Sequence, residues 1–252
     1  MIVSHKHKFI FVHVPKTGGT SVVKALYPYL DHKNDIILGG HPDHEDNNDQ
    51  DKKKAGELHK HSTALEIKKK VGEKIWNEYF IFAFVRNPYD RIASVYEWWK
   101  QTPWSGENKK KKEISEMKFE EFAASHYTGH PMVDFLSSKR TKKFYVEHSR
   151  IIEVDFIGSL EDAWGSFAYI CGMLNLPKIA LEKHNVSKNK KPTYQEYYNS
   201  KSISTIQAKF KEDLEKFNYR FDWGSDLGIE PEDKAIDLED LEDLSETPDA
   251  ED

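Results

Sequence analysis

The sequence has a single cysteine, Cys171, among its 252 residues. One thiol excludes an intramolecular disulfide framework and any metal cluster made of several cysteines. Long apolar runs are also lacking: the longest covers seven residues, 79–85, whereas a membrane-spanning helix needs roughly 18. The N-terminal residues contain no uninterrupted apolar region of the kind found in secretory signals. We therefore expect a protein of a reducing compartment, with no transmembrane segment and a cytoplasmic location.

Basic residues are scarce at the C-terminal end of the chain. Residues 230–252 contain twelve acidic side chains and one lysine, so this segment has a formal net charge of −11. The net charge of the whole chain is −6, so the other 229 residues carry +5. The same segment has no aromatic residue, which predicts disorder. We therefore expect a folded domain at residues 1–228 and an acidic, disordered tail at 229–252. The basic charge of the domain is compatible with a polyanionic ligand.

Short apolar segments of two kinds alternate along the chain. Residues 9–14, 79–85 and 151–158 are rich in β-branched and aromatic side chains, which predicts three buried strands, the first at 9–14. The clearest helix pattern covers 63–77, where Thr63 and Glu66 can form a capping box. Further helices are expected near 22–26, from Pro88 onward, near 117–125, from a Ser159–Asp162 cap to about 174, and from a Ser204 cap through Phe217. Strands separated by helices predict an α/β domain with a mainly parallel sheet.

The segment PKTGGTS, residues 15–21, lies between the first predicted strand and a helix. Gly18 and Gly19 let the backbone turn tightly and approach a ligand, and the N–H groups at a helix start favour an anion. A cation and hydroxyl donors are added by Lys16, Thr17, Thr20 and Ser21. A Walker A loop is excluded, because Lys16 precedes both glycines instead of following the second. The segment predicts a phosphate site, and the alternative is an ordinary turn with a solvated lysine.

A second polar group follows the strand predicted at 79–85. Arg86 comes directly after this strand, and Ser94 lies about two helical turns beyond Pro88. The planar fork of arginine and a serine hydroxyl both suit a terminal phosphate. An arginine alone at this position is more typical of a structural salt bridge. Together with residues 15–21, the pair predicts a ligand that is phosphorylated at two places.

PKTGGTS and FVRNPYDRIASVYEW together resemble the two cofactor signatures of sulfotransferases, which use 3′-phosphoadenosine 5′-phosphosulfate (PAPS). The amino-acid sequence of the two motifs is most similar to that of the membrane-type carbohydrate sulfotransferases, family 2. The resemblance continues in KHSTALEIKKKVG, VDFIGSLEDAWGSFAYIC, HNVSKNKKPTYQEYYNS and FKEDLEKFNYRF, and it covers about residues 8–222. It implies a P-loop-like three-layer sandwich, with a central, mainly parallel sheet flanked by helices.

The resemblance also implies which residues hold PAPS and its product, 3′-phosphoadenosine 5′-phosphate (PAP). The 5′-phosphosulfate would be held by Lys16, Thr17, Gly18, Gly19, Thr20 and Ser21, the 3′-phosphate by Arg86 and Ser94, and a closing segment would contribute Ser187 and Lys188. Relatives often carry a basic residue where this chain has Ser159, so a contact from that position is not expected. No metal is implied, and the histidines and acids at 41–46 have no metal-ligand spacing. Golgi relatives carry an anchor helix, which is not seen here and again favours a cytoplasmic enzyme.

Sulfuryl transfer to a hydroxyl group requires a general base, because the acceptor loses a proton as it attacks. Histidine is the natural choice near neutral pH. The histidine base of the family falls just before the helix predicted at 63–77 and matches His61, with His59 and Glu57 as alternatives. Lys16 would stabilise the negative charge on the leaving phosphate oxygen. His13, inside the first predicted strand, is expected to be a core or near-site residue.

We therefore predict an enzyme, a sulfotransferase that moves a sulfuryl group from PAPS to a hydroxyl of a carbohydrate-type acceptor by in-line displacement. Two alternatives remain: a P-loop-type nucleotide-dependent kinase, which would need an acidic Mg²⁺ ligand where this chain has Arg86, and a non-catalytic nucleotide-binding module, which would not need His61. Nucleic-acid binding is not expected, because the lysine runs at 52–54 and 109–112 lack interleaved aromatics. The acceptor stays open between an oligosaccharide, a glycolipid and a small alcohol. Sugar rings could stack on Trp98, Trp99 or Trp104.

Overall fold

The computed structural model describes residues 1–40, 49–101, 109–139, 151–182 and 191–222. Met1–Phe221 form one compact unit, and Asp222–Asp252 form a second. The acidic tail and its expected boundary at residue 228 lie outside the described residues. All of the architecture below belongs to the first unit.

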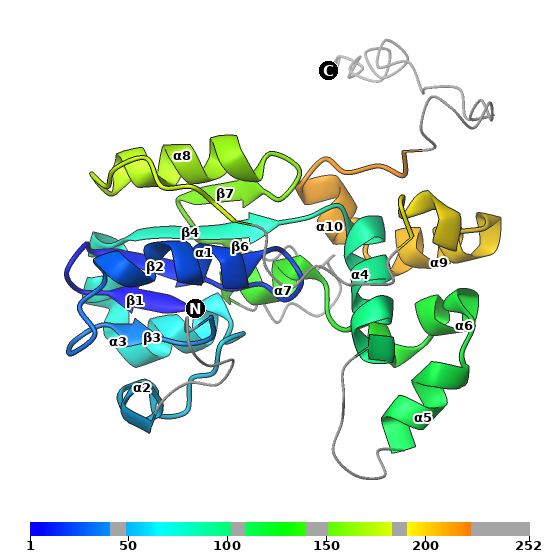
Figure 1. Cartoon of the computed structure of the whole chain (residues 1–252), viewed down its shortest axis with the longest axis horizontal. Coiled ribbons are helices and arrows are strands. Elements are labelled where there is room, and N and C mark those ends of the chain that lie inside the picture. The colour runs from blue at the N-terminus through cyan, green and yellow to red at the C-terminus, as the bar shows by residue number, and fades with distance from the viewer. Residues whose placement is uncertain (41–48, 102–108, 140–150, 183–190, 223–252) are drawn as a thin grey trace, which may run out of the picture. The chain divides into compact units, whose positions relative to one another are not determined.

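A five-stranded sheet forms the centre of this unit, in the order β3-β1-β2-β4-β7 (Figure 1). The strands are β1 (Ile2–Ser4), β2 (Phe9–Val12), β3 (Ile36–Ile37), β4 (Phe80–Val85) and β7 (Phe156–Ser159). β2 pairs with β4 and β4 with β7 in parallel, whereas β1 is antiparallel to both of its neighbours, β2 and β3. Only β1 therefore runs against the other four, and the predicted α/β class with a mainly parallel sheet is confirmed.

Two strand predictions were wrong in detail. The strand expected first, at residues 9–14, is preceded by β1, which lies inside the sheet but is too short to give a periodic pattern. The strand expected at 151–158 is two strands, because β6 (Ile151–Ile152) pairs with β5 (Ser137–Lys139) in a separate sheet. Asp155 marks the division: its N–H donates to the Ile81 carbonyl and its carboxylate accepts from the Ile81 N–H, at 2.8 and 2.7 Å.

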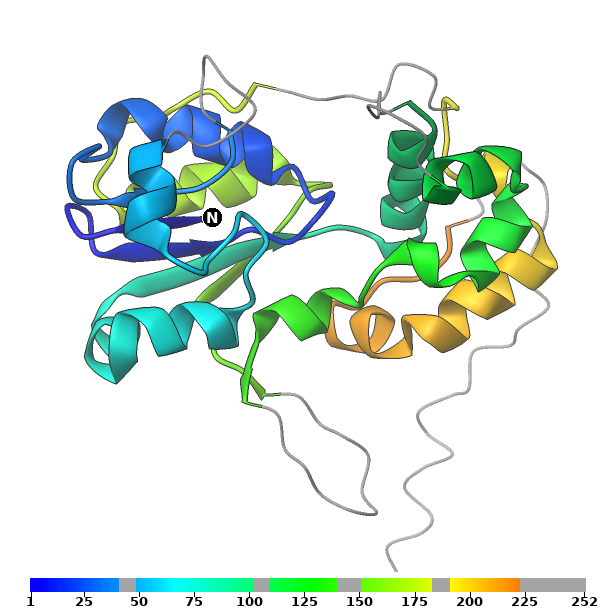
Figure 2. The same cartoon turned by 90° about the horizontal axis from the view of Figure 1, so that it is seen from below.

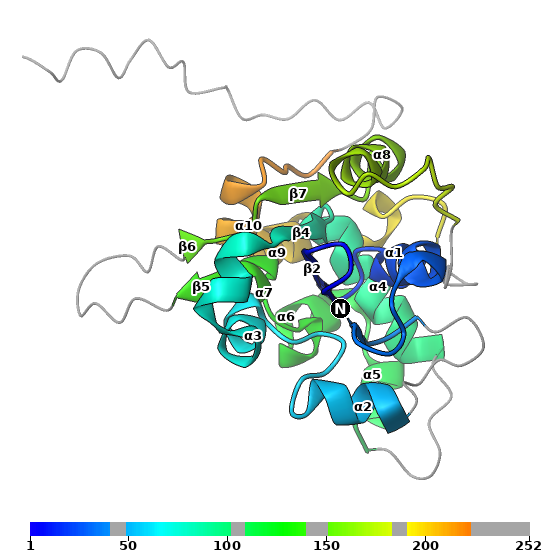
Figure 3. The same ribbon diagram turned by 90° about the vertical axis from the view of Figure 1, so that its left-hand side faces the viewer.

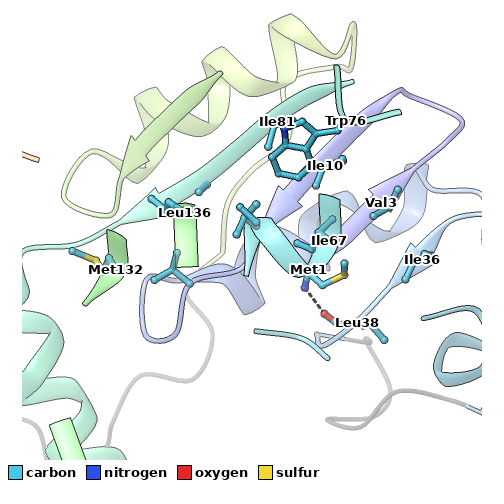
Figure 4. Close-up of a cluster of buried hydrophobic side chains, with 14 of the residues drawn as sticks. Met1, Val3, Ile10, Ile36, Leu38, Ile67, Trp76, Ile81, Met132 and Leu136 are labelled. Atoms are coloured by element: carbon cyan, nitrogen blue, oxygen red, sulfur yellow. Dashed lines mark hydrogen bonds between the residues drawn. The ribbon is translucent and has the colours of Figure 1, made fainter. Parts of the chain in front are cut away.

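Helices cover both faces of the sheet, which makes the predicted three-layer sandwich (Figures 1 and 3). One face is covered by α1 (Gly19–Leu26) and α8 (Ala163–Met173), whose apolar side chains pack with Phe82 and Phe84. The other face is covered by α3 (Ala64–Glu78) and α7 (Met132–Leu136), which pack on Ile10 and Ile81 (Figure 4). At the rim of this second core, the Met1 amino group donates to the Leu38 carbonyl at 2.7 Å (Figure 4).

A helical region follows β4 in the chain and has its own core (Figure 2). It contains α4 (Pro88–Gln101), α5 (Lys109–Glu116), α6 (Phe119–Ala124), α9 (Ser200–Lys209) and α10 (Lys211–Lys216). A short helix, α2 (Asp49–Ala55), lies apart from it in the sequence. The Ser204 cap was wrong: Asn199 caps α9 by accepting from the Ser202 N–H, while the Ser204 hydroxyl lies inside the helix and donates to the Ser200 carbonyl.

Helix starts follow the local sequence elsewhere. The capping box of α3 is confirmed, since the Glu66 carboxylate accepts from the Thr63 N–H at 2.7 Å and the Thr63 hydroxyl accepts from the Glu66 N–H at 3.3 Å. In α8 the cap is Asp162, which accepts from the Gly165 N–H, and Ser159 supports Asp162 by accepting from its N–H. None of the helices in the described ranges has the length and hydropathy needed to cross a membrane.

Candidate functional site

The predicted phosphate loop connects β2 to α1. Lys16 and Gly18 have φ angles of 66° and 80°, both in the left-handed region. Gly18 is the N-cap of α1, yet no side chain caps the helix and its first turn carries no acidic residue. The N–H groups of Gly19 and Thr20 have no acceptor among the described residues. A left-handed turn that leads into an uncapped helix start is an anion-binding arrangement.

Two arginines from the region after β4 brace this loop. Arg86 Nη1 donates to the Lys16 carbonyl at 3.2 Å, and Arg91 Nε donates to the Pro15 carbonyl at 3.1 Å. Thr17, whose side chain is buried, closes the loop from within by donating its hydroxyl to the Val14 carbonyl at 2.9 Å. These bonds hold the loop carbonyls on the protein side, so that the N–H groups of the helix start remain for a ligand.

Arg91 was not singled out from the sequence. Its side chain is fully buried on α4, Nη2 donates to the His130 carbonyl at 3.0 Å, and Nη1 has no hydrogen-bond partner in the described part of the chain. Burial lowers the pKa of Arg91 to about 10, so it stays charged at neutral pH. A second arginine five residues after Arg86 is the signal that could have indicated it, but its contacts with Pro15 and His130 are remote in sequence.

The two sets of residues predicted to bind phosphate lie at the same edge of the sheet, because β2 and β4 are parallel, Val12 pairs with Ala83, and both strands end nearby. Arg86 Nε and Nη2 both donate to Asp90 Oδ2, at 2.9 and 2.5 Å. With Nη1 bonded to the loop, two of its five N–H donors have no acceptor among the residues that the structure describes. Ser94 is four residues beyond Asp90, on the same face of α4, and is buried. Its hydroxyl has no hydrogen-bond partner among the described residues.

His61 lies in the turn before α3, half-buried, and reaches the strand that carries the phosphate loop. Its Nδ1 is 2.9 Å from the His13 carbonyl oxygen. A carbonyl can only accept, so Nδ1 carries the proton and Nε2 carries the lone pair. Burial lowers the pKa of His61 to about 4, with the positive charge of Lys60 adding to the effect and the bond to His13 opposing it. At neutral pH His61 is therefore an uncharged base with a defined tautomer.

The alternatives to His61 are less enclosed. His59 and Glu57 are both exposed. His59 Nδ1 accepts from the His61 N–H at 3.2 Å, so its ring supports the turn that carries His61. That Lys16, Thr20 and Ser21 supply a cation and hydroxyl donors to an anion stays a prediction. Ser21 is buried, and the other two are half-buried.

His13 follows β2 and fills the space between His61 and α1. Its ring meets the His61 ring edge-on, with centroids 4.7 Å apart, and stacks on Phe11 at 5.6 Å. A Cβ added to Gly19 would lie 2.0 Å from His13 Cδ2 and 2.2 Å from Nε2. The absence of a side chain at Gly19 is thus what lets the imidazole reach the helix start. His61 and the phosphate loop are joined through this one ring.

Some predicted residues cannot be placed in this geometry. Ser187 and Lys188 lie outside the described residues, as does the segment 41–46. Within the described ranges, no group of three or more His, Cys, Asp or Glu side chains is arranged to hold a metal ion. The arrangement that remains is a loop leading into an uncapped helix start, two arginines that donate to its carbonyls, and an uncharged histidine that is hydrogen-bonded to the end of the preceding strand.

Comparison with known proteins gives one match. A family model described as the sulfotransferase family, family 2, matches residues 1–220 of the chain. No curated protein and no solved structure matches the chain. The match contains the phosphate loop, Arg86, Ser94 and His61, and it ends before the acidic tail.

Proposed function

The chain belongs to the sulfotransferase family, and from this premise we propose that it transfers a sulfuryl group from PAPS to a hydroxyl group of a carbohydrate-type acceptor. One observation carries the proposal: His61, uncharged and with its lone pair on Nε2, is hydrogen-bonded to the end of the strand that leads into the proposed anion loop. A general base next to an anion site is what sulfuryl transfer needs, since the donor is an anion and the acceptor must lose a proton.

The loop at residues 15–21 fits the 5′-phosphosulfate of the donor. The uncapped start of α1 supplies N–H donors and a favourable dipole, and the left-handed backbone at Lys16 and Gly18 shapes the turn. Arg86 keeps two N–H donors for a 3′-phosphate. Ser94 lies on the face of α4 that carries Asp90, the carboxylate partner of Arg86. Ser187 and Lys188 complete the proposed donor site by resemblance alone.

PAPS supplies an activated sulfuryl group bonded to a phosphate oxygen. In the proposed step, His61 Nε2 takes the proton of the acceptor hydroxyl while the hydroxyl oxygen forms its bond to sulfur. The bond between sulfur and the phosphate oxygen breaks, and the helix start and Lys16 stabilise the charge that stays on the 5′-phosphate of PAP. Because the pKa of His61 is about 4, the protonated ring returns its proton to water readily.

A carbohydrate acceptor is supported by the family resemblance and by one exposed aromatic. Trp98 is 39% exposed on α4 and contacts Trp99 with ring centroids 5.1 Å apart. Trp98 lies four residues beyond Ser94 on this helix, and an exposed indole is a surface on which a sugar ring can stack.

The test supplies PAPS labelled with radioactive sulfur together with oligosaccharides, glycolipids and small alcohols. The wild type should label at least one acceptor without added metal, His61→Ala should not, and the matched control His59→Ala should retain the activity. Binding of PAP without transfer to any acceptor would instead support the non-catalytic module. Phosphate transfer from ATP that requires Mg²⁺ would support the kinase and overturn the proposal.

A further inference from the structure

The proposed reaction leaves one buried titratable group of the site unused. His13 is 4% exposed and lies between the proposed base and the phosphate loop. Its Nδ1 is sealed from solvent and has no hydrogen-bond partner among the described residues. A buried polar atom without a hydrogen-bond partner costs stability, so its protonation state is constrained.

The opposite edge of the ring points toward the anion site. Nε2 and Cδ2 occupy the place where a Cβ of Gly19 would stand. In a helix, the Cβ of each residue is tilted toward the N-terminus, so this edge of His13 lies at the open end of α1. The N–H groups of Gly19 and Thr20 are at the same end of the helix, and neither has an acceptor among the described residues. Nε2 therefore borders the space that the anion would fill.

The protonation state of His13 follows from its surroundings. Burial holds its pKa well below the usual 6.5, and the positive charge of Lys60 acts in the same direction. The ring is thus neutral and carries one proton. A proton on Nδ1 would be a buried donor with no acceptor, whereas a proton on Nε2 lies at the edge that faces the anion site. The Nε2–H tautomer is therefore favoured.

We propose that His13 donates a hydrogen bond from Nε2 to the sulfuryl group of the donor. Through this contact the protein binds the donor PAPS in preference to the product PAP. This inference rests on the proposed function. A sulfuryl oxygen is an anionic acceptor at the helix start, and PAP lacks that group. A neutral donor also avoids a second positive charge beside His61, whose ring centroid is 4.7 Å away and which gains a proton during transfer.

Equilibrium binding without acceptor tests the contact, because no turnover occurs. PAPS and PAP are titrated calorimetrically into the wild type, His13→Met, His13→Gln and the control His59→Gln. A hydrogen bond to a charged group predicts that His13→Met weakens PAPS binding about 10- to 100-fold and PAP binding less than about 2-fold. His13→Gln, which keeps an N–H donor at similar reach, should recover part of the PAPS affinity, and His59→Gln should bind both nucleotides as the wild type does.

Each other result contradicts the proposal. Equal loss of both nucleotides would make His13 a support of the loop, and no loss would remove the contact. A wild type that binds neither nucleotide would overturn the proposed function instead, since His13 then has no donor to distinguish. If His13→Met does not fold, ¹⁵N NMR of wild-type histidines, assigned with His13→Gln, decides: a proton on Nδ1 of His13 when PAPS is bound would overturn the inference.

Discussion

The Nδ1 atom of His61 lies 2.9 Å from the carbonyl oxygen of His13. This hydrogen bond connects the turn before α3 to the strand end that starts the phosphate loop, across 48 residues of sequence. It fixes the His61 tautomer, and it means that a displacement of the loop also displaces the proposed base. The predictions below follow from this connection and from the groups around it.

The pH dependence of turnover should report the low pKa of His61. The reaction needs the uncharged ring, and burial lowers its pKa to about 4. We expect kcat/KM to be level between pH 6 and 8 and to fall only as the pH drops through the region of 4. Initial rates at saturating acceptor and limiting PAPS measure this. An acidic limb centred near 6.5 would show that the base is not the buried ring of His61.

The stability of the fold should depend on pH through the same residue. The folded pKa of His61 is about 4, below the ordinary 6.5, so the unfolded chain binds more protons between these values and stability falls as pH falls. Above about 6.5 the contribution is absent. From pH 7 to 5, the wild type should lose about 2 kcal/mol more of its unfolding free energy than His61→Gln. Urea denaturation at both pH values checks this, and parallel losses would contradict the burial of the ring.

The 3′-phosphate assignment predicts a difference between two nucleotides. PAP should raise the melting temperature without metal, and it should do so more than AMP, because Arg86 and Ser94 are proposed to contact only the 3′-phosphate. Ser94→Ala removes a buried hydroxyl and little volume, so the variant should fold normally. In this variant, PAP and AMP should raise the melting temperature by more similar amounts than in the wild type. Differential scanning fluorimetry measures both shifts. Equal stabilisation by PAP and AMP in the wild type would rule out this role for Arg86 and Ser94.

Gly19 should tolerate no side chain. In Gly19→Ala the new Cβ would meet His13 Cδ2 at 2.0 Å, which forces His13 toward His61 or distorts the start of α1. We expect loss of turnover and of stability, by about 1–3 kcal/mol as for other overpacked cores. Gly172→Ala in α8 is the matched control, since nothing lies within 4 Å of its Cβ. It should be neutral or stabilising by up to about 1 kcal/mol. Similar behaviour of the two variants in thermal unfolding would contradict the packing of His13.

Local sequence patterns were enough to predict most of the layered fold and the turn at residues 15–21 between β2 and α1. The glycines of residues 15–21, the capping box at Thr63 and Glu66, and the strand before Arg86 all act over a few residues, so the sequence indicates them directly. β1 has no detectable pattern because three residues give no period. The division of residues 151–158 depends on the pairing of β6 with β5 and of β7 with β4, which the local sequence does not indicate.

The contacts that organise the site could not be predicted in the same way. Arg91 meets Pro15 across 76 residues, and His61 meets His13 across 48. Nothing near Arg91 in the sequence distinguishes a buried brace from a solvated helix residue, and His13 looks like any polar residue at a strand end. Their roles depend on the pairing of β2 with β4 and on the packing of α3, which arise only when the whole sheet forms.

The Arg86 guanidinium touches both the Lys16 carbonyl and the Asp90 carboxylate. A single rigid plane therefore spans the two halves of the proposed nucleotide site, and it cannot turn toward one half without changing its bonds to the other. In the proposed nucleotide site, occupancy of the 3′-phosphate position and the geometry of the loop at residues 15–21 would then be thermodynamically coupled, and such coupling is reciprocal. A nucleotide without the 3′-phosphate would consequently bind more weakly for two reasons: it lacks the contacts of that group, and Arg86 would hold the loop at residues 15–21 in its ligand-free geometry.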